Sequence, residues 1–230
     1  MIPVVSAVAS AALVCASPLV VRRLLAAGGD GDTEAGSVVA GEESPVAYAD
    51  VVAARWFLPV GVLASAGAAA TLALGVGPHP LLLVLVPLVP VGYALAVVDA
   101  RTRRLPRRVV VAATCAAAAG FITEWAVTGD LGVLARAGGG LLLARTSLWV
   151  LWLLGGVGFG DVRLAALTGL VTARIGWSAF VVGLCTALLL ATGFALLRAV
   201  LTRRSVRGQS IPLGPFLILG AWIGLIGVTA

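Results

Sequence analysis

Hydrophobic residues run along this chain in long blocks, separated by short segments that are rich in arginine or glycine. A helix that crosses a lipid bilayer needs about 20 consecutive, mostly apolar residues. On that template eight blocks qualify, at residues 2–21, 56–76, 80–98, 109–127, 138–157, 162–175, 176–198 and 211–229. The pattern therefore predicts an all-α fold, a polytopic bundle of about eight transmembrane helices, with six as the lower limit.

Charged residues are few, and they mark the ends of these blocks. Only 11% of the 230 residues are charged and 60% are apolar, whereas about a quarter of a soluble domain is charged. All 16 basic residues are arginines, gathered mostly at 22–23, 101–108 and 198–207. Loops rich in arginine stay on the cytoplasmic side, so these segments and the 158–163 turn are expected to face the cytoplasm across the cell membrane. Topology accounts for the net charge of +6, and nucleic-acid binding is not expected.

Residues 26–50 form the one long polar stretch of the chain. Its low hydrophobicity and its glycine, serine and acidic residues are typical of a flexible linker. We therefore expect residues 1–55 to hold the first helix and a cytoplasmic linker, and residues 56–230 to form the membrane core. The three cysteines are far apart and make no CxxC pair, so neither a zinc site nor another metal or cofactor is expected.

Two aspartates stand where an apolar block meets a polar loop. Asp99 closes the third block, and Asp161 opens the sixth, directly after Gly158-Phe159-Gly160. A carboxylate at the edge of a membrane span is costly and therefore indicates a functional site. Two carboxyl groups held close together resist ionising together, so one activates water while the other protonates a peptide carbonyl. Both lie on the predicted cytoplasmic side, which indicates aspartyl proteolysis. The alternative is a structural role, with each aspartate paired to a loop arginine.

Other hydrolytic chemistries lack their residues in this chain. The chain has no lysine, and its single histidine, His79, lies between two prolines in a predicted external turn. A zinc protease needs HExxH, and a Ser–Lys dyad needs a lysine. The paired aspartates are what remains.

Three short motifs resemble those of the type IV prepilin peptidase family. Asp99 is followed by Leu105-Pro106, as that family's first catalytic aspartate is followed by a hydrophobic residue and proline. Residues 158–164, GFGDVRL, are similar to its GxGDxKL motif, with arginine in the lysine position. Residues 211–216, IPLGPF, resemble its late Pro/Gly-Pro-Phe element. The motifs occur in family order and on one predicted side of the membrane.

The resemblance implies a membrane aspartyl endopeptidase of the GxGD type that removes the short basic leader of pilin-like precursors at the cytoplasmic face. It implies that Asp99 and Asp161 are the catalytic pair, without a cofactor. The residues that it implies for the turn and the substrate cleft are Gly158, Gly160, Arg163, Leu105, Pro106, Pro212, Gly214, Pro215 and Phe216.

The chain departs from the larger members of that family in two places. Those members carry paired CxxC motifs after the first span and also methylate the new terminus, whereas residues 22–55 contain no cysteine. The resemblance is therefore to a short member without the zinc and methyltransferase functions. Arg107 also stands where many members have aspartate or asparagine.

Two other classes of protein share part of this pattern. Proteases of the presenilin or signal-peptide-peptidase type also use GxGD, but their late Pro-Ala-Leu element is missing here. A non-enzymatic permease or assembly scaffold would have no reason to bring Asp99 and Asp161 together.

Two charged residues lie deep in consecutive blocks. At 1.5 Å per residue, Glu124 lies roughly 22 Å and Arg145 roughly 18 Å from the cytoplasmic ends of their predicted helices. A lone charge at such depth costs at least about 2.5–3.5 kcal/mol. We therefore expect a structural Glu124–Arg145 salt bridge. The alternatives are that Glu124 snorkels outward beside Trp125 or pairs with Arg136 instead.

Overall fold

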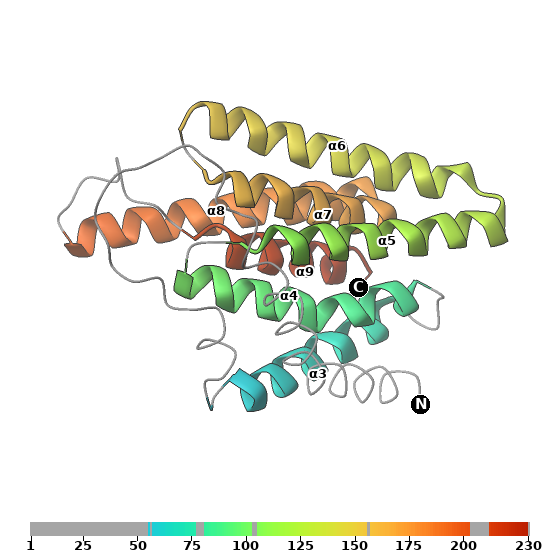
Figure 1. The fold of residues 1–230 in the computed structure, drawn as a ribbon, viewed down its shortest axis with the longest axis horizontal. Helices are drawn as coiled ribbons and strands as arrows, with labels where there is room; N and C mark the ends of the chain where they lie inside the picture. Colours follow the sequence, from blue (N-terminus) through green and yellow to red (C-terminus); the bar gives the residue numbers. More distant parts are fainter. Residues whose placement is uncertain are drawn as a thin grey trace.

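The computed structural model describes residue 55 and residues 57–76, 81–102, 105–155, 157–202 and 212–229. Every regular element in these ranges is an α-helix (Figure 1). The helices are α3 (Phe57–Val76), α4 (Leu82–Thr102), α5 (Arg107–Thr128), α6 (Leu131–Leu153), α7 (Phe159–Ile175), α8 (Trp177–Thr202) and α9 (Gly214–Thr229). They match, one for one, the seven blocks predicted after residue 55. The predicted helix at 2–21 and the linker at 26–50 lie outside the described residues.

The composition of these helices identifies a helical membrane protein. Among the described residues, α4, α5 and α8 are long and apolar enough to cross a membrane, and shorter apolar stretches occur in α3 and α9. The other two helices differ: α6 contains two arginines and three consecutive glycines, and α7 has 17 residues.

Several helix boundaries differ from the predicted ones, and three of these differences are near polar residues. Helix α4 continues to Thr102, so Asp99 lies inside its last turns instead of at its end. Helix α7 begins at Phe159, which places Asp161 inside its first turn. Helix α6 begins earlier than predicted, because the Asp130 side chain accepts a hydrogen bond of 2.8 Å from the Gly132 N–H and caps the helix.

The helices run back and forth, so that alternate connections lie at the same end of the bundle. Figure 1 shows the end of α4 and the starts of α5, α7 and α9 at one end, together with the ends of α6 and α8. The segments that carry the three sequence motifs are therefore brought to one end of the molecule.

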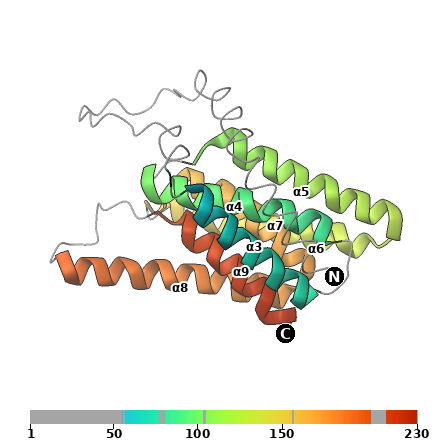
Figure 2. The ribbon, with the colours of Figure 1, turned by 90° about the horizontal axis from the view of Figure 1, so that it is seen from below.

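Helix α7 is the centre of the bundle. It packs against α5, α6, α8 and α9, and most of its residues are buried. Its closest neighbour is α6, because Gly140 and Gly169 face each other and a Cβ on either would overlap the other helix. Small residues of this kind let two membrane helices approach closely. The same close packing joins α8 to α9 at Gly183 and Gly220, and Figure 2 shows α9 beside α8 from another side.

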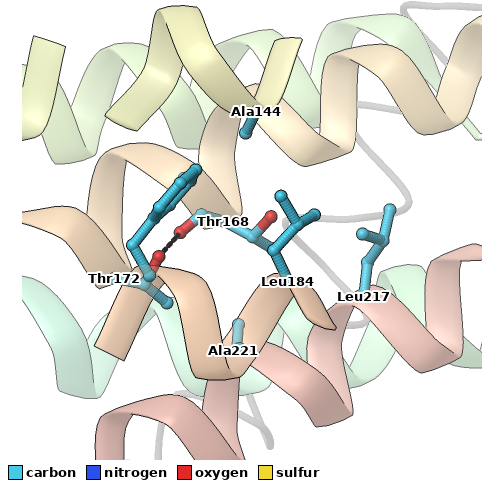
Figure 3. A pocket seen from close by; sticks show the side chains of 9 residues that line it. Ala144, Thr168, Thr172, Leu184, Leu217 and Ala221 are labelled. Carbon is cyan, nitrogen blue, oxygen red and sulfur yellow. Dashed lines mark hydrogen bonds between the residues drawn. The ribbon is translucent and has the colours of Figure 1, made fainter. Parts of the chain in front are cut away.

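The place where α6, α7, α8 and α9 meet is tightly filled. A cavity of about 10 Å³ remains there, lined by Thr168 and Thr172 of α7 and otherwise by apolar residues and glycine (Figure 3). The Thr172 hydroxyl donates to the Thr168 carbonyl at 2.8 Å, and the Thr168 hydroxyl donates to the Ala165 carbonyl at 3.1 Å. The threonines satisfy their hydroxyls within α7, so the helix keeps an apolar contact with its neighbours.

Candidate active site

Asp99 is held between α4 and the start of α9. Its side chain is almost fully buried, with the residue 3% exposed. Its Oδ2 accepts a hydrogen bond of 2.9 Å from the backbone N–H of Gly214. The first N–H groups of a helix have no partner inside the helix, so they are available to a carboxylate. Gly214 is the first residue of α9, and the bond therefore joins the first motif to the third.

Gly214 allows this contact because it has no side chain. A Cβ added there would lie 2.6 Å from Oδ2 of Asp99 and 3.1 Å from its Cβ. Distances this short force the carboxylate to move. A glycine is thus required at the start of α9 for Asp99 to keep its position.

Asp161 is held by the turn that precedes α7. The residue is 7% exposed, and its Oδ2 accepts a hydrogen bond of 3.2 Å from the backbone N–H of Gly158. Gly158 is the N-cap residue of α7 and Asp161 is the third residue of the helix. The carboxylate reaches back over the first turn, as an acidic residue does in a capping box. The turn and the aspartate therefore fix each other's position.

The three motifs come together in space. A Cβ on Gly160 would lie 3.2 Å from the Cβ of Leu105, so the segment after Asp99 lies against the start of α7. The charge of Asp99 acts on the carboxyl group of Asp161. The two aspartates are thus within electrostatic reach, which the scaffold alternative did not predict.

Neither aspartate forms an ion pair with any arginine that the structure describes. The alternative of a purely structural pairing with loop arginines therefore has no support in this part of the chain. Arg163 instead lies over the ring of Phe159, with its guanidinium carbon 4.7 Å from the ring centroid. Within the described ranges, no three His, Cys, Asp or Glu side chains gather to hold a metal ion.

The other predicted cleft residues lie at the starts of α5 and α9. Pro106 is the N-cap residue of α5, and Pro212 is half-buried just before α9. Phe216 turns toward α8, where its ring lies 5.4 Å from that of Phe194 between centroids. Phe216 therefore holds α9 in place, whereas Pro215 lines an open space on the other side of the helix.

That open space is an apolar cleft of about 810 Å³ between α3, α4, α7 and α9. It begins beside the aspartates: Ala100 follows Asp99, Pro215 follows Gly214, and Leu164 lies one turn after Asp161, and all three line it. Sequence reasoning missed this cleft, because its walls come from helices that carry no motif at those positions. The available signal was the spacing of small residues along α4.

The deep charges pair differently from the prediction. The guanidinium of Arg174, at the end of α7, binds both carboxylate oxygens of Glu124, with 3.0 Å between Nε and Oε2. Arg145 is exposed on α6, and Arg136 lies 3.6 Å from Asp130. The predicted Glu124–Arg145 bridge is wrong because α7 packs more closely than α6 against α5.

Comparison with known proteins agrees with this geometry. Residues 87–196 match the type IV leader peptidase family. The matched range contains both aspartates and their motifs, and it ends before the segment at 212–216 that Asp99 contacts. No curated protein and no solved structure matches the chain. The match covers residues 87–196, slightly less than half of the chain, and over this range the chain is similar to the type IV leader peptidase family.

Proposed function

We propose that this protein is a membrane aspartyl endopeptidase in which Asp99 and Asp161 cleave the basic leader from a pilin-like precursor. One observation carries the proposal. Both carboxyl groups are buried and within electrostatic reach of each other, and in each of them Oδ2 accepts one hydrogen bond from a backbone N–H. The Oδ1 atoms make no hydrogen bond to any described residue, so they are available to water and to a peptide carbonyl.

The proposed reaction uses the two carboxyl groups in complementary states. The ionised carboxylate takes a proton from a water molecule as its oxygen attacks the peptide carbonyl carbon. The protonated partner donates its proton to the carbonyl oxygen, which gives a neutral tetrahedral intermediate. When the C–N bond breaks, the amine leaves with a proton from the first carboxyl group, and the second regains its proton from the collapsing hydroxyl. The pair thus returns to one shared proton.

We also propose that the catalytic end of the bundle faces the cytoplasm. The arginines at the end of α4 and the start of α5, Arg101, Arg107 and Arg108, are exposed. They lie at the same end of the bundle as the aspartates (Figure 1). Arginine-rich ends of membrane bundles stay in the cytoplasm. With the predicted helix at 2–21 as an eighth span, the segment after Arg22-Arg23 lies on this side as well.

The test is leader removal from a pilin-like precursor co-expressed with the full-length protein. The wild type should shorten the precursor, while Asp99→Asn and Asp161→Asn should leave it uncut although both proteins reach the membrane. Asp130→Asn is the matched control, because Asp130 is an exposed helix cap and asparagine caps a helix equally well. Cleavage by either active-site variant, or no cleavage by the wild type, would contradict the proposal.

A further inference from the structure

We propose that the apolar cleft between α3, α4, α7 and α9 binds the transmembrane helix of the precursor. Within it, the row Gly92, Ala96 and Ala100 on α4 determines which helices fit. This inference rests on the proposed function, since it assigns the part of the substrate that continues from the scissile bond into the membrane.

The position of the cleft gives the first argument. Three of its lining residues, Ala100, Leu164 and Pro215, adjoin the residues that build the catalytic pair. Along α4 the lining extends from Leu85 to Ala100, which at 1.5 Å per residue is roughly 22 Å. A helix of comparable length would therefore lie along the cleft with its end at the aspartates. There the chain must become extended before water attacks it.

The shape of the walls gives the second argument. Gly92, Ala96 and Ala100 recur every four positions and share one face of α4, and Ala64 and Ala68 of α3 line the cleft with the same spacing. Such faces accept a closely packed helix. Where this protein uses small residues for packing, a partner helix already fills the space, as at Gly140 and Gly169.

The faces along the cleft are open in comparison. A Cβ on Gly92 would meet only the Cγ2 of Ile218 at 3.5 Å, and a Cβ on Gly67 would meet nothing within 4 Å. Figure 2 shows α3, α4 and α9 side by side around this region. The cleft therefore has the lining of a helix-packing site without a helix in it among the described residues.

Photo-crosslinking tests the position of the substrate helix directly. A benzophenone-bearing phenylalanine analogue replaces Leu63, which lines the cleft and is 76% exposed, in the full-length Asp161→Asn protein. The matched control places it at Leu189 of α8, which is 72% exposed and away from the cleft. The probe is a synthetic precursor with an arginine-rich leader and about 20 apolar residues, in phosphatidylcholine–phosphatidylglycerol vesicles.

The expected result is a crosslink between the apolar segment of the precursor and position 63, with none at position 189. A lipid adduct alone at position 63, while the wild type cleaves the same precursor, would overturn this inference and leave the proposed function standing. An equal yield at both positions would do the same. Failure of the wild type to cleave any precursor would overturn the proposed function itself.

A second variant tests the row of small residues by kinetics. Ala96→Leu fills the cleft without touching the aspartates, so KM for the precursor should rise at least about tenfold, as one misplaced group in an apolar pocket does, while kcat stays near the wild-type value. Ala119→Leu on the exposed side of α5 should change neither constant. An unchanged KM in Ala96→Leu, or a fall in kcat alone, would show that the row does not select the substrate.

Discussion

Two buried acidic sites lie near opposite ends of α7, and they accommodate a carboxylate in opposite ways. Near the last turn, Glu124 shares both oxygens with the guanidinium of Arg174, and their side chains are 10% and 11% exposed. Near the first turn, Asp99 and Asp161 each receive one backbone N–H and no arginine that the structure describes. A guanidinium that binds both oxygens holds its partner in place, whereas a single N–H leaves one oxygen of each carboxyl group free to exchange a proton. The comparison separates a structural carboxylate from the two that we propose to be reactive.

The largest expected effect is the loss of catalysis when either reactive carboxylate is removed. Asp99→Ala and Asp161→Ala should each lower the rate of leader removal by on the order of 10³-fold or more, because general acid–base catalysis contributes about 10²–10⁴-fold. Thermal unfolding of both purified variants should stay close to that of the wild type, since each loses only one hydrogen bond. A retained cleavage rate in either variant would refute the catalytic assignment.

Breaking the structural pair should act on stability instead. Glu124→Gln or Arg174→Met leaves one buried group without its partner, which costs about 3–5 kcal/mol. The melting temperature in detergent should fall accordingly, while the cleavage rate per folded molecule is retained. The double variant Glu124→Leu/Arg174→Leu is the control, and it should recover most of the loss because no charge is then left alone. Single variants as stable as the wild type would show that the pair has no structural role.

A substitution at Gly214, whose N–H orients Asp99, should lower the cleavage rate more than the loss of one hydrogen bond would indicate. Gly214→Ala introduces a Cβ where the structure leaves 2.6 Å to Oδ2 of Asp99, so the carboxylate is displaced. A displacement of about 1 Å at a reacting group can lower the rate by about 10²-fold. Steady-state cleavage assays should show this as a fall in kcat with little change in KM. Gly193→Ala, which meets nothing within 4 Å, should have no effect on either constant.

The smallest effect is expected at the turn before Asp161. Gly160→Ala brings a Cβ to 3.2 Å from the Cβ of Leu105, and Leu105 lies in a loop that can shift slightly. We expect a cost of about 1 kcal/mol, which corresponds to a factor of about five in rate. Measured side by side, an effect larger than that of Gly214→Ala would reverse the order of importance that the structure assigns to the two glycines.

Much of this fold follows from local patterns along the chain. Each helix in the described ranges corresponds to an apolar block, since length and hydropathy depend on neighbouring residues alone. The start of α6 and the end of α4 differ from the limits of their apolar blocks, because polar residues near a helix end decide where it stops. Asp130 caps α6 before its apolar block begins. Helix α4 continues past its apolar block to Thr102.

The partners of the polar residues depend on which helices pack together. Arg174 was not expected beside Glu124, because helices that are consecutive in the chain are usually neighbours. In the structure α7, which follows α6 in the chain, packs against α5 and brings Arg174 to Glu124. Gly214 was named from its motif, but its bond to Asp99 follows from the packing of α9 against α4. Catalytic roles for these residues stay predictions until the variants are measured.

The central place of α7 has a consequence for how the protein is made. As the chain leaves the ribosome, a segment of 17 residues with an aspartate near its start and an arginine near its end enters lipid poorly by itself. Its side chains are covered by helices made both before and after it. We therefore expect α7 to enter the bilayer together with α6 and to settle only when α8 and α9 arrive. Because Asp99 obtains its hydrogen bond from α9, the newly made protein acquires its arranged aspartate pair only after that helix has been synthesised.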